Sequence, residues 1–401
     1  MTVSAFEPTM QAALERLGAM RPRAYPDTRG DLRGAVTRLS PYLTHGLLTV
    51  PDVVHRLRAD HGVPPRHKLV FELAWREYFR HVWAHEGEGI FASLHDGPLP
   101  DDVYAPGVPH DVREARTGLA VIDRAVATLY DSGYLHNHAR MWLASYLVHL
   151  RKVHWRAGAD WLYAHLLDGD LASNHLSWQW IAGTGSHRPY LFNASNVLRY
   201  APADWQVAGT CLDTSYAELE AVAFDATRRF DGGLRDDEAG VAEPAVMTAP
   251  PGAVRDAASL ESEIEGRDVW LVHPWCLADP PQGLVPVAML DAGFHARWPW
   301  SARRWRFVMQ RMVAVSAAAP CVDRADAIVQ ALSRARSVHG RFDPHLGPAF
   351  ERVPLTAAPQ AFEGPPERCR SFSTWWSRAR LRDDMHDAAT IAQVESQPES
   401  A

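Results

Sequence analysis

The sequence predicts a mainly α-helical protein with a small α/β unit near its C-terminal end. Three observations support this fold class. Apolar residues recur at helical spacing through the first ~225 residues, strand patterns are nearly absent there, and two short apolar runs follow a stretch rich in Gly, Ala, Pro and acid. With 401 residues, 47% of them hydrophobic, the chain is long enough to form two domains.

The helical part is predicted to cover residues 1–225. "PTMQAALERLGAM" (8–20) and "KLVFELAWREYFRHVWAHE" (68–86) carry apolar residues at helical intervals among charged ones. "GLAVIDRAVATLYDSGYLHNHARMWLASYLVHLRKVHW" (118–155) predicts two further helices, which Ser132-Gly133 separates.

The composition changes after this domain. Residues 226–264 are rich in Gly, Ala, Pro and acid, which predicts a flexible linker. "DVWLVHPW" (268–275) and "LVPVAMLD" (284–291) have the pattern of buried parallel strands, and "SARRWRFVMQRMVAVSAAAP" (301–320) that of a helix. We therefore expect a small α/β domain over 265–385 and a disordered tail over 386–401.

Several classes of protein are disfavoured by composition. The net charge of -7 and pI near 6.3 argue against binding of nucleic acid through bulk charge, although a local basic face remains possible. The four cysteines form no CxxC pair and no HExxH occurs, so no metal site is expected. There is no GxGxxG or Walker loop, no signal-peptide pattern and no apolar stretch of membrane-spanning length, so we expect a cytoplasmic protein.

Two helical stripes combine charged, amide and aromatic or sulfur-containing side chains. Glu72, Trp75 and Arg76 fall at i, i+3 and i+4, which is equally compatible with an exposed Glu–Arg pair. Asn137, Arg140 and Met141 repeat this spacing in an apolar helix. A buried Arg requires an acid. Asp168 and Asp170 are the candidates, and we predict that Arg140 pairs with Asp168, which by itself is compatible with a purely structural role.

A third stripe precedes a glycine-containing loop. Asn174 and Trp178 share one helix face, whereas Trp180 is rotated from Trp178 by about 200°. Two rings that face two environments, followed by Gly183 and Gly185, suit a helix between two bound molecules. The alternative is a buried helix with protein on both faces.

Four blocks together resemble the FAD-binding helical domain of the photolyase/cryptochrome family. They are "TRLSPYLTHGLLT" (37–49), "ELAWREYFRH" (72–81), "TGLAVIDRAVATLYDSGYLHNHARM" (117–141) and "DGDLASNHLSWQWIAGTGSHRPYLFN" (168–193), in the order and spacing typical of the family. The resemblance covers about residues 20–205. The later α/β unit is similar to the Rossmann-like domain that photolyases carry at the N-terminus, as if the order were permuted and the unit shortened, so no antenna chromophore is expected.

The resemblance implies non-covalently bound FAD and a set of residues around it. The implied cofactor contacts are Tyr25, Thr37, Arg38, Leu39, Ser40, Arg140, Asp168, Asp170 and Asn174. Asn174 is expected to face flavin N5, Asp170 the ribityl and adenine side. Trp178 and Trp155 match the proximal and middle members of the electron relay, and Tyr104 is only a candidate for the outermost one. His175 stands where the family has a second Asn.

The resemblance also implies a substrate, pyrimidine dimers in UV-damaged DNA. The expected substrate contacts are Glu72, Trp75, Arg76, Asn137, Met141 and Trp180, with Glu72, Asn174, Trp178 and Trp155 in catalytic roles. Glu72 would stabilise charge on the dimer, Trp75 and Trp180 would stack on flipped bases, and Arg76 would bind flanking phosphates.

Three functions stay open at this stage. Retention of the pocket residues favours a deoxyribodipyrimidine photo-lyase, a monomer that splits cyclobutane dimers by electron transfer from excited reduced FAD. The first alternative is a cryptochrome-like blue-light photoreceptor without repair. The second is repair of (6-4) photoproducts, disfavoured because Asn137 and Met141 stand where those enzymes carry His.

Overall fold

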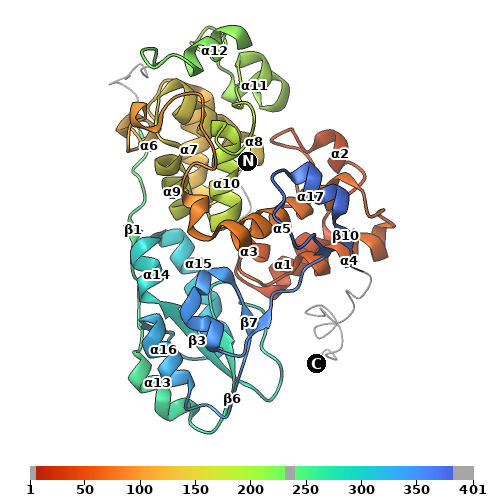
Figure 1. Ribbon diagram of the computed structural model, residues 1–401, viewed down its shortest axis with the longest axis vertical. Helices are drawn as coiled ribbons and strands as arrows, with labels where there is room; N and C mark the ends of the chain where they lie inside the picture. The colour runs from red at the N-terminus through yellow and green to blue at the C-terminus, as the bar shows by residue number, and fades with distance from the viewer. Residues whose placement is uncertain (1–5, 231–239, 383–401) are drawn as a thin grey trace.

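The computed structural model describes residues 6–230 and 240–382. Two groups of helices form the upper part of the molecule in Figure 1, and the α/β unit lies below them. The predicted tail, 386–401, lies outside the described residues.

The N-terminal half is helical, as predicted. Its α-helices are α1 (Met10–Gly18), α2 (Tyr25–Thr28), α3 (Ser40–Thr44), α4 (Val50–His61), α5 (Lys68–Glu86), α6 (His110–Arg113), α7 (Ala120–Ser132), α8 (Asn137–Ser145), α9 (Trp155–His165), α10 (Leu171–Ala182), α11 (Ala194–Tyr200) and α12 (Tyr216–Ala223). A π-helical turn, Tyr146–Leu150, extends α8. Residues 6–225 contain no β-strand.

Local sequence signals set the ends of these helices. Thr49 and Asp52 form a capping box at the start of α4, which ends at Gly62 with φ of 61°. Gly133, with φ of 68°, ends α7 at the predicted break. Asp170 caps α10 by accepting from the Ser173 amide at 2.8 Å, and Gly183 ends that helix.

The C-terminal half combines a small parallel sheet with helices. Its elements are β1 (Val246–Met247), α13 (Ala257–Ile264), β2 (Asp268–Val272), β3 (Val285–Asp291), α14 (Ala292–Arg297), β4 (Trp300–Ser301), α15 (Ala302–Ser316), β5 (Cys321–Asp323), α16 (Ala325–Leu332), β6 (Ser337–His339), β7 (Arg341–Phe342), β8 (Thr356–Ala357), β9 (Phe362–Glu363), α17 (Phe372–Arg378) and β10 (Arg380–Leu381).

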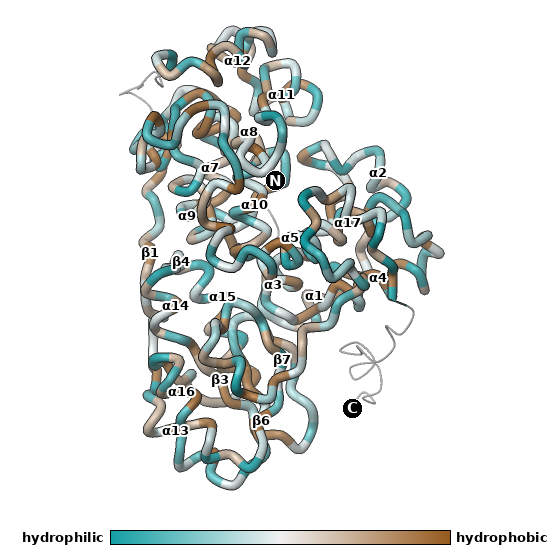
Figure 2. Tube along the Cα trace, in the orientation of Figure 1, coloured by the Kyte–Doolittle hydropathy of each residue, from teal (hydrophilic) through white to brown (hydrophobic). Residues whose placement is uncertain are grey.

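The two predicted strands are the centre of the sheet. β2 and β3 pair in parallel, and the strand order is β5-β3-β2-β6. Apolar residues run along β3, as Figure 2 shows, and its middle residues are buried. Such burial on both faces is typical of parallel strands. The Rossmann-like class of this unit and the domain boundaries stay predictions.

The structure differs from the predicted linker at its end. Ala257–Ile264 of the segment 226–264 forms α13 instead of an irregular chain. Ala257, Leu260 and Ile264 turn one face into the core, because their spacing places them on one side of the helix. The segment 231–239 lies outside the described residues.

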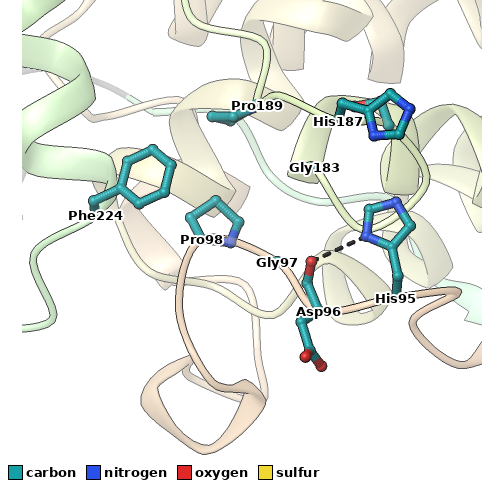
Figure 3. Close-up of a pocket in the computed structure, with 9 residues that line it drawn as sticks. His95, Asp96, Gly97, Pro98, Gly183, His187, Pro189 and Phe224 are labelled. Atoms are coloured by element: carbon teal, nitrogen blue, oxygen red, sulfur yellow. Dashed lines mark hydrogen bonds between the residues drawn. The ribbon is translucent and has the colours of Figure 1, made fainter.

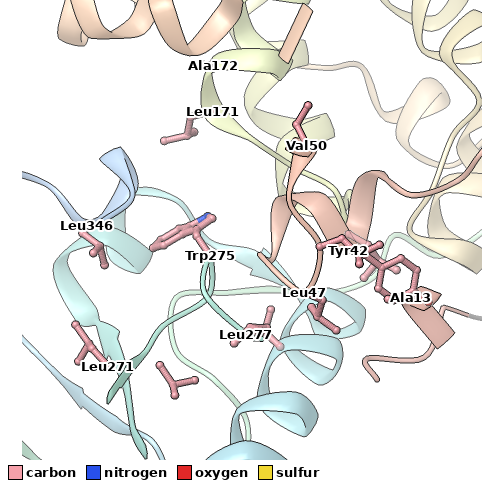
Figure 4. Close-up of a cluster of buried hydrophobic side chains, with 14 of the residues drawn as sticks. Ala13, Tyr42, Leu47, Val50, Leu171, Ala172, Leu271, Trp275, Leu277 and Leu346 are labelled. Atoms are coloured by element: carbon pink, nitrogen blue, oxygen red, sulfur yellow. The ribbon is translucent and has the colours of Figure 1, made fainter. Parts of the chain in front are cut away.

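The hydrophobic core extends across the predicted boundary between the domains. One cluster joins α1, α3, α4, α5 and the start of α10 to the α/β unit and α17. Figure 4 shows part of it, with Tyr42 and Leu47 near Trp275 and Leu277. A second cluster fills the group of helices α7–α12. The α/β unit is thus packed directly under the first helices.

Two buried polar side chains connect the α/β unit to the turn before α10. Arg304 on α15 donates to the carbonyl oxygens of Tyr163 at 2.9 Å and Gly169 at 2.6 Å. The ring nitrogens of His45 lie 2.6 Å from Pro274 O and 2.8 Å from Leu167 O. Because buried polar groups need partners, these contacts hold residues 167–170 in place.

Candidate functional site

An ion pair marks the centre of the candidate site. Arg140 Nη2 on α8 lies 3.0 and 2.7 Å from the carboxylate oxygens of Asp168, which confirms the predicted pairing. The Asp168 side chain is 3% exposed and that of Arg140 is 24% exposed. Arg140 Nε also donates to Leu135 O at 2.9 Å. The pair is therefore oriented, and the Arg140 side chain stays partly accessible.

The segment "TRLSPYLT" lies against this pair. Thr44, the last residue of α3, donates to Asp168 O at 3.2 Å. At the other end of the segment Arg38 has φ of 54°, a left-handed conformation that costs a non-Gly residue about 1–2 kcal/mol. Leu39 is buried, and its amide lies 3.4 Å from Thr37 Oγ1. Ser40 opens α3.

Tyr134 connects these two groups and was missed by the sequence prediction. Burial raises the pKa of its hydroxyl, and the charges of Arg140, Asp168 and Arg38 act on it. The Arg140 guanidinium lies 5.5 Å from its ring centre. Tyr25 is close as well, since burial and then Glu72 raise its pKa, with a smaller effect from Tyr134. Tyr134 thus lies among residues from three of the four sequence blocks, Arg38, Arg140 and Asp168.

Helix α10 adds an amide and an indole. Asn174 is 8% exposed, and its Nδ2 donates to Ala159 O on α9 at 2.8 Å. Trp178 is buried so closely against α9 that a Cβ on Gly158 would lie 2.3 Å from its ring. Trp155, one turn before Gly158, lies in the same buried cluster. The packing of α9 on α10 thus brings both tryptophans into one buried cluster.

The histidine at position 175, where the photolyase/cryptochrome family has a second Asn, has a structural explanation. His175 is fully buried, with Nε2 2.8 Å from Asp160 Oδ1 and Nδ1 2.8 Å from Leu171 O. Burial, the largest effect, lowers its pKa. The imidazole therefore fastens α10 to α9 on a face other than that of Asn174.

Aromatic rings continue from Trp155 toward Tyr104. The centroid of His154 lies 5.7 Å from that of Trp155 and 6.3 Å from that of Tyr104. Backbone hydrogen bonds between Ala105 and residues 152 and 154, of 2.7 and 2.9 Å, hold Tyr104 there. The structure thus places the candidate Tyr104 one ring away from Trp155.

The structure does not support the predicted role of Asp170 as a cofactor contact. Its carboxylate is fully buried and accepts from Arg80 at 2.5 Å, and Arg76 lies 3.5 Å away. Burial alone would raise the pKa of Asp170, but the two guanidinium groups outweigh it and lower the pKa. With the Ser173 amide also bound, its oxygens are used within the protein.

The predicted role of Arg76 as a phosphate contact is also wrong, because its partners too lie within the protein. It donates to Thr44 Oγ1 at 3.2 Å and faces Asp170, so it does not point toward a DNA backbone as predicted. Arg80, four residues later on α5, also lies 3.1 Å from Asp343, whose carboxylate lies 2.5 Å from His345 Nδ1. Sequence reasoning missed these three residues. Only Arg80 had a signal, as a second cation on the face of Arg76.

The predicted role of Trp75 in stacking on a flipped base is the third prediction that the structure corrects. Its ring is stacked on Phe372 of α17, with centroids 3.9 Å apart and planes 9° apart. The face predicted to hold a flipped base is therefore covered by protein. Glu72, one turn earlier, is partly exposed and forms ion pairs with Lys68 at 2.8 Å and Arg29 at 3.2 Å.

The remaining substrate residues lie at the surface. Asn137 is exposed at the start of α8, with Nδ2 3.3 Å from Met141 Sδ. Trp180 is 40% exposed, whereas Trp178 is 2% exposed. The two indoles thus face two environments, as the helical spacing predicts.

A pocket of about 230 Å³ lies at the far end of α10. Figure 3 shows His95, Asp96 and His187 with Pro189 and Phe224 around it. None of the predicted site residues lines it. Among residues 6–230 and 240–382, no helix has the length and apolar character that a membrane crossing requires.

Comparison with known sequences shows which class of domain these helices resemble. Residues 69–207 match the FAD binding domain of DNA photolyase. A deoxyribodipyrimidine photo-lyase of Streptomyces griseus is 37% identical over 166 residues, 40% of this chain and 35% of the relative. A cryptochrome DASH of Gloeobacter violaceus is 30% identical over 189 residues, 45% of this chain and 37% of the relative.

The helical part of the chain is thus similar to the FAD-binding domain of photolyases and cryptochromes. The chain spans 35% to 40% of the length of the first curated relatives. Among solved structures, a cryptochrome of Synechocystis sp. PCC6803 aligns with a TM-score of 0.44 at 29% identity, covering 49% of this chain and 44% of that one.

Three residues around Tyr134, and Asn174 on α10, fit FAD by their chemistry. Arg38 and Arg140 offer cations to phosphates or a ring carbonyl, Asp168 offers an acceptor to a ring N–H, and Asn174 offers both kinds of group. The strained backbone of Arg38 is the kind of feature that concentrates at ligand sites.

Proposed function

We propose that this protein repairs cyclobutane pyrimidine dimers in DNA in a light-driven reaction that uses reduced FAD. The observation that carries the proposal is that α10, which carries Asn174 and Trp178, begins directly after the turn that holds the Arg140–Asp168 pair, within the region that matches the FAD binding domain. The photo-lyases among the relatives support the choice of reaction.

The cofactor would be held by residues of several segments. Arg38, Thr37 and Ser40, with the Leu39 backbone, would bind its phosphates. Arg140, Asp168 and Asn174 would bind the edge of its ring system, with Tyr25 and Tyr134 lining the site. When bound and reduced, FAD supplies an electron on absorbing blue light. Trp178, Trp155, His154 and Tyr104 offer a series of rings for returning the cofactor to its reduced state.

The substrate side would be formed by Glu72, Asn137, Met141 and Trp180. Glu72, when protonated, would donate a hydrogen bond to a carbonyl oxygen of the dimer, and its burial by the lesion would strengthen that contact. Trp180 is exposed and available for stacking on an extruded base. Asn137 and Met141 in place of His favour the cyclobutane lesion over the (6-4) photoproduct.

A cryptochrome-like photoreceptor is the second candidate function. The observation in its favour is the contact of Phe372 with Trp75, which covers a ring expected to meet the substrate. Cryptochrome DASH proteins among the relatives are consistent with it. A sensor would keep the cofactor residues around Tyr134 without needing the partly exposed Glu72.

A repair assay separates the two functions. Chemically reduced, flavin-loaded protein is mixed with an oligonucleotide that contains one thymine dimer, and the dimer is quantified after blue light or darkness. We expect loss of the dimer only in the light. Flavin-loaded protein that leaves the dimer intact in the light would exclude repair and favour the photoreceptor.

A substitution then tests the role of Glu72. Glu72→Gln is expected to lower the repair yield while flavin content stays unchanged, because this side chain lies on the substrate side. Glu88→Gln, at an exposed residue of the turn after α5, is the matched control. Loss of flavin in Glu72→Gln would show that Glu72 belongs to the cofactor site instead.

A further inference from the structure

Residues 361–382 form a C-terminal arm that is fastened to α5. Its residues Ala361 and Phe362 donate their amides to the buried carboxylate of Glu77, at 2.7 and 3.0 Å. Further along, Cys369 N donates to His81 Nε2 at 3.1 Å, and Tyr78 donates to Cys369 O at 3.3 Å. β9 and β10 pair at the base of the arm. Because all these partners lie on α5, the arm is a fixed part of the surface of that helix.

The aromatic residues of the arm cover Trp75. Phe372 stacks on it, and Trp376 lies parallel to Phe372 with centroids 6.0 Å apart. The guanidinium of Arg66, which lies just before α5, is 5.6 Å from the ring centre of Trp376. These contacts place α17 within one helical turn of Glu72, beside the proposed substrate site. Figure 1 shows α17 next to α5 and α2.

The arm is basic although the whole chain is acidic. Its residues include five arginines and two glutamates, a net charge of +3, whereas the chain carries -7. Arg370, Arg378 and Arg380 are exposed, as is Arg66. Within residues 6–230 and 240–382 no carboxylate forms an ion pair with any of these four, whereas Arg368 is paired with Glu86.

The geometry of the arm suits a nucleic-acid backbone. The seven residues of α17 span about 10 Å, roughly three nucleotide steps of 3.4 Å, with Arg370 two residues before the helix and Arg378 at its last position. Phe372 and Trp375 are almost completely buried, so the arm offers no apolar face for insertion into a bilayer. Exposed cations on a rigid support are what phosphate contacts require.

We propose that the C-terminal arm binds the phosphate backbone of DNA beside the site that contains Glu72 and Trp180. The contacting groups are Arg66, Arg370, Arg378 and Arg380. This inference rests on the proposed function for the identity of the partner. The arm lies outside residues 69–207, which match the FAD binding domain, so this surface is an addition made by the C-terminal part of the chain.

Salt-dependent DNA binding tests the proposal. The full chain, loaded with flavin and kept in the dark, is titrated into a labelled, undamaged 20-base-pair duplex at 50 to 200 mM salt, and binding is followed by fluorescence anisotropy. The test variant carries Arg370→Gln, Arg378→Gln and Arg380→Gln. The matched control carries Arg306→Gln, Arg324→Gln and Arg352→Gln, three exposed arginines of the α/β unit.

We expect the test variant to bind at least about tenfold more weakly at 0.1 M salt, with a salt slope lower by about 2 to 3, since each lost phosphate contact removes roughly 0.9. The control keeps both values. The single charge reversal Arg378→Glu should weaken binding in the same direction. Flavin absorbance and circular dichroism check that each variant is folded.

Two results would overturn the proposal. One is equal affinity and equal salt slope for the test and control variants. The other is binding of the full chain to phosphatidylserine vesicles, lost in the test variant, with unchanged binding to the duplex. Because the assay uses undamaged DNA in the dark, a failure of photorepair leaves its outcome unaffected, and the two proposals fail separately.

Discussion

At the residue scale, the Arg140–Asp168 pair is the contact on which cofactor binding most depends. Replacing Arg140 by Gln leaves the buried Asp168 carboxylate without its cation, which costs more than the pair contributes when intact. We expect Arg140→Gln to lower the free energy of unfolding by about 2 kcal/mol and to reduce the flavin content of purified protein. Urea denaturation and the ratio of flavin to protein absorbance measure the two effects.

The control for this change is Arg124→Gln. Arg124 pairs with Asp204 at 3.0 Å, but both side chains are 49% exposed. Such pairs contribute about 0–1 kcal/mol, so stability and flavin content should be nearly unchanged. Equal effects of the two substitutions would contradict a special role for the Arg140–Asp168 pair.

A second residue-scale prediction concerns Tyr104. If this residue is the outer member of the ring series, Tyr104→Phe should slow the reduction of oxidised flavin by blue light, because a phenylalanine ring is much harder to oxidise. Absorbance during illumination with an external reductant measures the rate. Tyr216→Phe, at an exposed tyrosine, is the control. If the rate of flavin photoreduction is unchanged in Tyr104→Phe but falls in Trp155→Phe, Trp155 would be the outermost member of the electron relay.

At the element scale, Glu77 couples α5 to the C-terminal arm in a pH-dependent way. Burial, opposed by the amides of Ala361 and Phe362, raises the pKa of its carboxyl from 4.5 to about 7. The folded state then holds a proton that the unfolded chain loses near pH 4.5, so this group's contribution to stability is complete below pH 4.5. It is lost as the pH rises to about 7.

Glu77→Gln is expected to remove this dependence. At about 1.4 kcal/mol per pKa unit, the shift corresponds to roughly 3 kcal/mol between pH 4.5 and pH 7. Urea denaturation between pH 5 and pH 8 should therefore show that the free energy of unfolding of the variant increases relative to that of the parent protein as the pH rises. Parallel stability curves for the two proteins would mean that Glu77 does not titrate in this range.

At the scale of the whole molecule, Arg304 joins the α/β unit to the turn that carries Asp168. Arg304→Met removes the donor to Tyr163 O and Gly169 O, while the methionine fills much of the same space. We expect a loss of about 2 kcal/mol and unfolding in two separate transitions, because the two parts lose two of the buried hydrogen bonds that join them.

Two probes report this separation. Flavin fluorescence follows the helical part, and far-ultraviolet circular dichroism follows the whole chain. Arg306→Met changes an exposed residue of the same helix and should leave both probes coincident. Coincident transitions in Arg304→Met would show that the shared apolar core alone couples the two parts.

Sequence periodicity and end signals predicted much of the fold. The helix at 68–86, the break at Gly133 and the central strands β2 and β3 depend on residues within a few positions of one another. The linker prediction was wrong at Ala257–Ile264, because the bulk composition of 226–264 hid the local signals of α13, its N-cap Asp256 and the apolar spacing of Ala257, Leu260 and Ile264.

The candidate site, like the fold, was predicted only in part. The spacing on α8 and α10, with the need of a buried arginine for an acid, predicted the Arg140–Asp168 pair and the opposite exposure of Trp178 and Trp180. The roles predicted for Arg76, Asp170 and Trp75 were wrong. Arg76 and Arg80 pair with Asp170, and the ring of Trp75 stacks on Phe372.

What the sequence by itself determined is the set of local elements and the resemblance of its helical part to the FAD binding domain of DNA photolyase, because periodicity, caps and motif spacing act within short stretches of chain. Only the tertiary structure decided that Phe372 covers Trp75, that Glu77 holds the amides of Ala361 and Phe362, and that Arg304 reaches Gly169. These contacts join residues more than 130 positions apart, and which distant groups meet depends on how the apolar faces pack into a common core.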